Sequence, residues 1–221
     1  MLNVYYLKIS DYKGCNLKDL SSLASKSAVE NIQFISSDKV KRSKLLGDIM
    51  RRQLLLKLCH LSEKDYRVLQ NDFGKPFLSG LKTPVYFNIS HSNEYIVIAI
   101  SDCEVGVDIE FRSEAKIGIA HRFFHVEEYR KLQQSHGEVQ RIMFFDYWSA
   151  KESYLKYCGT GLSGSLSSFW VDFSNDVSYI VKGHSRVPVF LRECPIDVQY
   201  SSFICSETDE EPILESYELD S

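Results

Sequence analysis

The alternation of residues 105–111 constrains the fold more than any other stretch of the chain. Apolar side chains occupy every second position, which predicts a β-strand with one buried face. Asp108 and Glu110 then point to the same side, where two carboxylates repel each other unless a cation lies between them. Carboxylate oxygens of this kind suit Mg²⁺. For an isolated pair, however, a solvated acidic face explains the pattern more simply.

A helix farther along the chain carries a third carboxylate of interest. The spacing of apolar residues predicts this helix over 140–157, with two glycines ending it. Glu152 falls on its apolar face, between Trp148 and Lys156. A buried carboxylate needs a partner. That partner is either Lys156, through a helix ion pair worth about 0.3–0.5 kcal/mol, or a metal shared with the acidic pair of the strand.

The remaining periodicities predict a mixed α and β fold. Helices are also expected over 19–31, 39–59 and 117–132. Strands are expected over 2–9, 85–89, 95–100, 169–173, 179–182, 187–192 and 198–205. Gly74 and Pro76 indicate a turn that leaves Lys75 exposed. The acidic residues from Ser206 onward predict a partly loose tail.

Composition and charge exclude several classes of protein. The 221 residues include six scattered cysteines without a C-x-x-C pair, which favours a reduced, cytoplasmic protein without a zinc site. The longest clear apolar run, residues 95–100, is far too short to span a membrane, and residues 1–7 lack the features of a signal peptide. The formal net charge of −4 argues against general nucleic-acid binding, although a local basic patch can still hold a nucleotide phosphate.

Seven short segments between residues 71 and 162 form an ordered set. They are Gly74–Pro76, Phe87–Ser92, Gly106–Glu110, Arg122–Phe124, Trp148–Ser153, Lys156 and Gly159–Leu162. Each segment alone is a weak signal. Together, in this order and spacing, they resemble the 4′-phosphopantetheinyl transferase superfamily, in its long, single-chain type that activates peptide and polyketide synthetases.

The resemblance implies an α+β fold built from a pseudo-twofold pair of similar lobes. Each lobe would be a small antiparallel sheet with packed helices, and the active site would lie in the cleft between the lobes. Residues 1–104 would form the N-terminal lobe, on the side of the coenzyme A nucleotide. Residues 105–221 would form the C-terminal lobe, with the metal site and the carrier-protein docking surface. Because such a chain supplies both lobes itself, a monomer is expected.

The same resemblance implies a reaction and its metal ligands. The phosphopantetheine arm of coenzyme A would move to a serine hydroxyl of an apo carrier protein, with 3′,5′-ADP as the other product. Asp108, Glu110 and Glu152 would hold Mg²⁺, with Mn²⁺ as the alternative ion, which agrees with the interpretation of these carboxylates given above. Glu152, acting directly or through bound water, or Glu128 would take the serine proton. Lys156 would stabilise or protonate the leaving phosphate.

Further residues are expected beside coenzyme A. Ser90 and His91 would hold its 3′-phosphate, and Lys75 would lie by the adenine nucleotide. The first lobe fits the family pattern less closely, and either Arg42 or Lys44 would supply its basic residue. Together with Lys151, beside the metal carboxylate, and Lys156, on the phosphates, these residues complete the expected coenzyme A site.

The resemblance also implies that the carrier protein docks on residues 112–124. Since the family's carrier domains are acidic around their serine, a basic and apolar surface would suit them. Arg112, Lys116, Arg122 and Phe123 have the required character.

Two other functions remain open on the sequence. A non-catalytic coenzyme A-binding scaffold would keep the fold, but it has no need of three converging carboxylates. An Mg²⁺-dependent nucleotide phosphohydrolase would explain those carboxylates but not Ser90, His91 or the Trp148–Glu152 pattern. Analysis of the products separates the three functions: transfer to protein, no turnover, or free phosphate.

Overall fold

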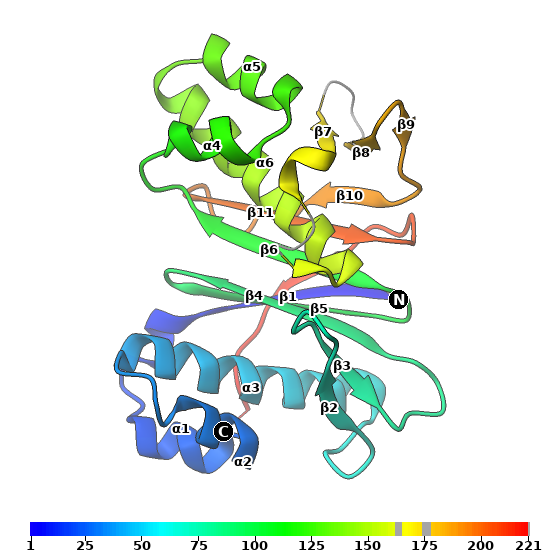
Figure 1. Cartoon of the computed structure of the whole chain (residues 1–221). Helices are drawn as coiled ribbons and strands as arrows, with labels where there is room; N and C mark the ends of the chain where they lie inside the picture. Colours follow the sequence, from blue (N-terminus) through cyan, green and yellow to red (C-terminus); the bar gives the residue numbers. More distant parts are fainter. Residues whose placement is uncertain (162–164, 174–177, 221) are drawn as a thin grey trace.

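The computed structural model describes residues 1–161, 165–173 and 178–220 of the chain. Figure 1 shows two halves stacked one above the other, with strands from both halves at the junction. The mixture of helices and small sheets confirms the expected α+β fold.

The N-terminal half is a four-stranded sheet covered by one long helix. The strands lie in the order β12 (Ile213–Ser216), β1 (Leu2–Lys8), β5 (Tyr95–Ser101) and β4 (Tyr86–Ser92). All neighbours are antiparallel except β12 and β1. Helix α3 (Asp38–Cys59) buries its apolar stripe against this sheet. The smaller elements are a 3₁₀ turn η1 (Ile9–Tyr12), α1 (Leu17–Leu23), α2 (Lys26–Ile32) and a hairpin of β2 (Arg67–Gln70) and β3 (Pro76–Ser79).

The C-terminal half repeats this plan with a three-stranded sheet. The antiparallel strands lie in the order β10 (Phe190–Glu193), β11 (Tyr200–Ser206) and β6 (Val105–Phe111). Helix α6 (Gly137–Cys158) packs on the sheet and has 22 residues, as α3 does. The other elements are α4 (Ile117–Phe123), α5 (Val126–Gln134), a 3₁₀ turn η3 (Leu166–Ser168), β7 (Trp170–Asp172), β8 (Tyr179–Lys182) and β9 (Ser185–Arg186).

Two predicted helices are each divided into two by an internal N-cap. The helix expected over 19–31 is α1 and α2, because the Ser25 side chain accepts a hydrogen bond from the Ala28 backbone N–H. The helix expected over 117–132 is α4 and α5, because His125 and Glu128 form a reciprocal capping box. Such caps satisfy the free N–H groups of a new first turn, and apolar periodicity does not detect them.

Side chains of β4 join the two halves at β6. Since alternate residues of a strand point the same way, three polar residues of β4 face the edge of β6 together. Their oxygens accept hydrogen bonds from every second N–H of that strand. The pairs are Asn88 with Val107 at 3.0 Å, Ser90 with Ile109 at 3.4 Å and Ser92 with Phe111 at 3.0 Å. The Asn-x-Ser-x-Ser pattern therefore fixes the register between the halves.

The C-terminal tail returns to the N-terminal half. Strand β12 pairs in parallel with β1, and Leu219 donates its backbone N–H to the Tyr12 hydroxyl at 2.7 Å. Figure 1 shows the C-terminus beside α1 and α2. The expectation of a loose tail is therefore wrong. Residues 213–216 also lie with the N-terminal sheet, although the expected division at residue 104 places them in the other lobe.

Helix α6 lies very close to β6 at Gly106. A Cβ atom there would overlap the backbone of Ser153 and Tyr157, and backbone atoms cannot rotate away. We expect Gly106→Ala to lower the free energy of unfolding by at least about 1–3 kcal/mol. In the matched change Gly118→Ala the added methyl meets nothing within 4 Å, so stability should be unchanged or slightly higher. Urea unfolding of both variants measures the difference, and equal stabilities would contradict this close contact.

Candidate active site at the junction of β4, β6 and α6

Three carboxylates of β6 and α6 influence one another electrostatically. Asp108 is only 3% exposed, and Glu110 follows it on the same face of β6. Burial, followed by the charge of Asp108, raises the pKa of Glu110 to about 7. The same two causes raise the pKa of Glu152 on α6 to about 7. The three side chains thus form a desolvated cluster of like charge.

Two oxygens of this cluster are buried without a hydrogen-bond partner among the described residues. They are Asp108 Oδ2 and Glu152 Oε1. Leaving a buried acceptor unsatisfied is costly, and native proteins mostly avoid it. Within the described part of the chain, however, no group of three or more acidic, His or Cys side chains lies so that it could hold a metal ion. The charge, the oxygen donors and the unpaired atoms of the cluster suit a divalent cation, although its side chains are not arranged around one.

Lys156 crosses from α6 to both strands. Its Nζ lies 2.6 Å from Asp108 Oδ1 and donates to Ser90 Oγ at 2.8 Å. The Ser90 hydroxyl in turn donates to Asp108 Oδ1 at 2.9 Å. The ion pair of Lys156 is thus with the strand carboxylate, and not with Glu152, which was one of the two partners that the sequence left open for that glutamate. This cation partly balances the acidic cluster and stands at its edge.

The N-terminal half contributes Lys44 and His91 on the side of Lys156. His91 lies on β4, and its pKa is lowered first by partial burial and then by the charges of Lys44 and Lys156, which favours the neutral imidazole. Ser90, in contrast, is buried, and its hydroxyl already has partners at the junction. His91 is therefore accessible to a ligand, whereas the hydroxyl of Ser90 is used in hydrogen bonds between the two halves.

The choice between Arg42 and Lys44 follows from their contacts. Arg42 donates to the backbone carbonyls of Tyr12 and Cys15 at 2.8 and 2.6 Å, so its guanidinium holds the chain around η1. Lys44 is exposed and close enough to His91 to lower its pKa. Lys44 is therefore the residue of the two that stands beside the other basic groups.

Lys75 is not the exposed residue that the turn pattern predicts. Its side chain is 13% exposed. The ammonium donates to the Glu104 carboxylate and to the carbonyls of Val105 and Tyr157, the latter two at 3.3 and 3.0 Å. A lysine ammonium has three donors. All three are used inside the protein, which places Lys75 at the junction between β6 and the end of α6.

Glu128 and Lys151 form a buried ion pair away from the carboxylate cluster. Both side chains are fully buried, and Lys151 Nζ lies 2.8 Å from Glu128 Oε2. Glu128 also accepts the N–H groups of Val171 and His125 at 2.8 and 2.9 Å. Burial raises the pKa of Glu128 and lowers that of Lys151 to about 8. The expectations that Glu128 is the base and that Lys151 contacts coenzyme A are therefore wrong, because both residues support the fold.

We expect Lys151→Met to lower the free energy of unfolding by about 3–5 kcal/mol, because it leaves the Glu128 carboxylate buried without its cation. Adding Glu128→Gln should restore part of this loss, since the amide oxygen can still accept the two N–H bonds. Urea unfolding measures both variants. If Lys151→Met were as stable as the unmodified protein, the ion pair would contribute nothing to stability.

The expected docking surface is only partly available. Arg112 is 11% exposed and binds Asp146 at 3.0 Å, Ser201 at 2.9 Å and the Val198 carbonyl at 3.0 Å. It therefore joins β6, α6 and β11 and is not a free surface cation. Phe123 is 40% exposed on α4, with the Arg122 guanidinium above its ring.

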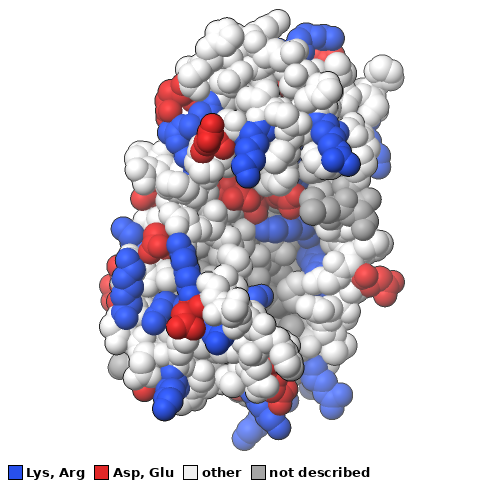
Figure 2. Space-filling view, turned by 60° about the vertical axis from the view of Figure 1, so that its left-hand side comes forward, with Lys and Arg blue, Asp and Glu red and all other residues white. Residues whose placement is uncertain are grey.

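A small pocket next to Glu110 was not foreseen from the sequence. Its volume is about 210 Å³. The lining residues are Glu110, Ser113, Glu114, Lys116, Ile119, Phe144, Phe145 and Trp148. These aromatic residues lie at helical spacing on α6, which on sequence alone indicates only a core face. Figure 2 shows a hollow between the two halves on one face of the molecule, with both acidic and basic side chains along it.

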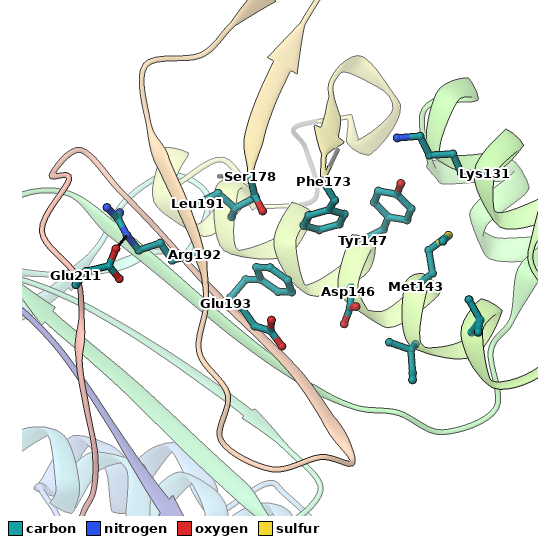
Figure 3. A pocket seen from close by; sticks show the side chains of 13 residues that line it. Lys131, Met143, Asp146, Tyr147, Phe173, Ser178, Leu191, Arg192, Glu193 and Glu211 are labelled. Carbon is teal, nitrogen blue, oxygen red and sulfur yellow. Dashed lines mark hydrogen bonds and ion pairs between the residues drawn. The ribbon is translucent and has the colours of Figure 1, made fainter. Parts of the chain in front are cut away.

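A larger cavity, of about 750 Å³, lies elsewhere, between α6 and β10. It is lined by residues such as Met143, Tyr147 and Leu191 (Figure 3). Arg192 and Glu211 form an ion pair at one end. None of the three clustered carboxylates lines this cavity, so the candidate active site is not there.

No helix within the described residues is long and apolar enough to cross a membrane.

The family models and the curated relatives that match this chain carry the same family name. Residues 104–207 match the 4′-phosphopantetheinyl transferase superfamily, and residues 16–103 match the family described as 4′-phosphopantetheinyl transferase, N-terminal. The transferase gsp of Aneurinibacillus migulanus is 36% identical, over 85% of this chain and 78% of its own length. The transferase ffp of Bacillus subtilis is 32% identical, over 82% and 86%, and Sfp of Bacillus subtilis strain 168 is 32% identical, over 73% and 72%.

Among solved structures, holo-[acyl-carrier-protein] synthase of Thermotoga maritima overlaps part of the chain. The match has a TM-score of 0.40 and 18% identity, and covers 47% of this chain and 62% of that one. This partial overlap adds nothing to the family assignment.

Proposed function

The chain belongs to the 4′-phosphopantetheinyl transferase superfamily and is a transferase of that kind, and on this premise we propose how its residues perform the reaction. The donor is coenzyme A, the acceptor is a serine hydroxyl of an apo carrier protein, and the second product is 3′,5′-ADP. One observation carries the assignment to this site. Unpaired buried oxygens of Asp108 and Glu152 lie in one charged cluster beside the ammonium of Lys156.

The acidic cluster is the proposed metal site. Asp108, Glu110 and Glu152 would hold one divalent cation, with Mg²⁺ as the first choice and Mn²⁺ as the alternative. When bound, such an ion neutralises charge on the pyrophosphate of coenzyme A. The raised pKa values of Glu110 and Glu152 support this assignment, since a bound cation would relieve the repulsion between the carboxylates that contributes to these shifts.

Side chains of the protein itself would bind and orient the donor. Lys156 faces the acidic cluster and would contact the pyrophosphate, while His91 and Lys44 would hold the 3′-phosphate on the β4 side. During transfer, the serine oxygen forms a bond to phosphorus as the bond to the 3′,5′-ADP oxygen breaks. Lys156 would stabilise the charge that develops on that leaving oxygen.

Glu152 is the proposed general base. One of its oxygens, Oε1, is buried without a hydrogen-bond partner among the described residues, so this atom, directly or through a bound water, could take a proton. It would accept the serine proton as the oxygen attacks. Glu128, the other candidate, is buried against Lys151 and cannot reach a substrate.

The carrier protein would dock beside the pocket that Glu110 and Lys116 line. Arg122 and Phe123 on α4 offer the exposed basic and apolar groups that suit an acidic partner. The family type and the internal arrangement of two halves support a monomer. The free cysteines of the described chain are compatible with the proposed cytoplasmic location.

The stability of the metal-free protein should fall as the pH rises from about 5 to 8. Glu110 and Glu152 have an ordinary pKa of 4.5 and a folded-state pKa of about 7, so the folded state binds more protons in that window. Since metal competes with these protons, Mg²⁺ should raise Tm more at pH 8 than at pH 5. Thermal unfolding with Mg²⁺ or EDTA tests this. A Tm increase that does not depend on pH would place the ion elsewhere.

Product analysis tests the function itself. An apo carrier domain incubated with the protein, coenzyme A and Mg²⁺ should gain the mass of one phosphopantetheine and release 3′,5′-ADP, and EDTA should abolish both. Binding of coenzyme A without turnover on several carriers would favour a scaffold. Release of free phosphate without carrier modification would favour a phosphohydrolase.

A further inference from the structure

We propose that the turn formed by residues 71–75 is an inter-lobe latch that positions the catalytic end of α6, with Asn71 as its main positioning residue. The proposal rests on the function proposed above, because it assigns the latch to Glu152 and Lys156. The turn connects β2 to β3 in the N-terminal half, whereas α6 belongs to the C-terminal half.

Asn71 organises the turn and also contacts α6. Its Oδ1 accepts hydrogen bonds from the backbone N–H groups of Phe73 and Lys75 at 3.0 and 2.9 Å. Its Nδ2 donates to the Gly159 carbonyl at 2.8 Å, across 88 residues of sequence. One side chain therefore fixes the shape of the turn and its attachment to the other half.

Lys75 makes the second attachment. Its ammonium donates to the Tyr157 carbonyl of α6 and the Val105 carbonyl of β6, and it is paired with Glu104. A cation at the C-terminal end of a helix also interacts favourably with the helix dipole. Lys75 thereby ties the last turn of α6 to the start of the strand that carries Asp108.

Gly159 leaves room for these contacts. It ends α6 in the left-handed conformation, with φ of 67°. A Cβ atom there would lie 2.9 Å from Asn71 Nδ2 and 3.1 Å from Lys75 Cδ. The absence of a side chain therefore permits both the helix end and the close approach of the turn.

The latch acts on the turn of the helix that carries the proposed catalytic groups. Lys156 directly precedes Tyr157, whose carbonyl Lys75 holds, and Glu152 is one turn earlier. On its other side Lys156 is bound to Ser90 and Asp108. Contacts on both sides of the helix end thus fix where the ammonium stands relative to the acidic cluster.

The substitution Asn71→Asp should remove the contact of the turn with α6 while keeping the hydrogen bonds inside the turn. The carboxylate can still accept the two N–H bonds of the turn, but it cannot donate to the Gly159 carbonyl. We expect kcat for carrier modification to fall about threefold to tenfold, the effect of one lost hydrogen bond, while KM for coenzyme A changes less than twofold. Asn71→Ala should reduce kcat at least as much. The exposed Asn31 of α2 offers the same chemical change, Asn31→Asp, as a control that should leave both parameters unchanged.

The outcomes separate this proposal from the proposed function. If the unmodified protein transfers phosphopantetheine and Asn71→Asp has the same kcat, the latch is wrong and the function stands. A raised KM for coenzyme A at unchanged kcat would also overturn the latch, because a shift of Glu152 and Lys156 must lower kcat. If the unmodified protein transfers nothing, the function itself fails.

Discussion

Replacing Glu152 with glutamine should lower kcat for carrier modification by about 10²–10³-fold, a loss typical of removing one charge-stabilising group from an active site. The change removes the charge of the proposed metal ligand and the proposed base together, while keeping the shape of the side chain. Steady-state kinetics of phosphopantetheine transfer at saturating coenzyme A measures the effect. The exposed Glu30 of α2 gives the matched control Glu30→Gln, which should retain full activity.

Stability distinguishes this loss from unfolding. Glu152 is a desolvated carboxylate with an unpaired buried oxygen and a like charge nearby, so neutralising it should keep or raise the Tm of the metal-free protein. Activity close to that of the unmodified protein would remove Glu152 from the mechanism. A loss of activity with a clear fall in Tm would make its role structural.

Lys156→Met is the second change with a large expected effect. It removes the ammonium that lies 2.6 Å from Asp108 and that would stabilise the leaving phosphate. We expect kcat to fall by about 10²-fold or more. It also leaves the buried Asp108 carboxylate without its cation, with only the Ser90 hydroxyl still donating to Oδ1, so the free energy of unfolding should fall by about 1–3 kcal/mol.

The two effects of Lys156→Met can be measured independently. Transfer kinetics gives the first and urea unfolding the second, with Lys26→Met at a 91% exposed position as the control. Mg²⁺ should restore part of the stability, because the vacated side of Asp108 can then face a cation, but it should not restore kcat. Recovery of full activity in excess Mg²⁺ would mean that Lys156 only balances charge.

Local pattern predicted the elements that carry the site. The alternation of residues 105–111 predicted β6, with Asp108 and Glu110 on the same face of the strand. Helical spacing predicted α6, with Glu152 and Lys156 on the same face of the helix. Both kinds of periodicity depend on residues a few positions apart, which the sequence displays directly. The ordered motifs then indicated the family, which the comparisons confirm.

Partners distant in sequence were not predictable in the same way. Lys151 stands next to Glu152 in the chain, yet on a helix it points elsewhere and binds Glu128, 23 residues away. Arg112 looked like a surface cation until Asp146 and Ser201 were placed beside it. In each case a charged residue has a polar partner from another element, and nothing in its own neighbourhood shows which one.

The contacts that join the two halves were not predicted either, for a similar reason. The resemblance assigned Ser90 to the 3′-phosphate of coenzyme A, but its hydroxyl forms hydrogen bonds with Ile109, Asp108 and Lys156. The acidic tail was expected to be partly loose because charge dominates its composition, but β12 pairs with β1, and Tyr217 is buried in the core of the N-terminal half. Both features depend on how the two halves meet.

Direct measurement of metal binding tests the central claim, that the carboxylates of β6 and α6 hold the cation of the transferase. Mn²⁺ binding in the presence of coenzyme A can be followed by electron paramagnetic resonance of the free ion, in the unmodified protein and in Glu152→Gln. We predict one tight site per chain that Mg²⁺ displaces and that the substitution weakens at least tenfold. Equal affinity in the two proteins, or no bound ion in either, would contradict the claim.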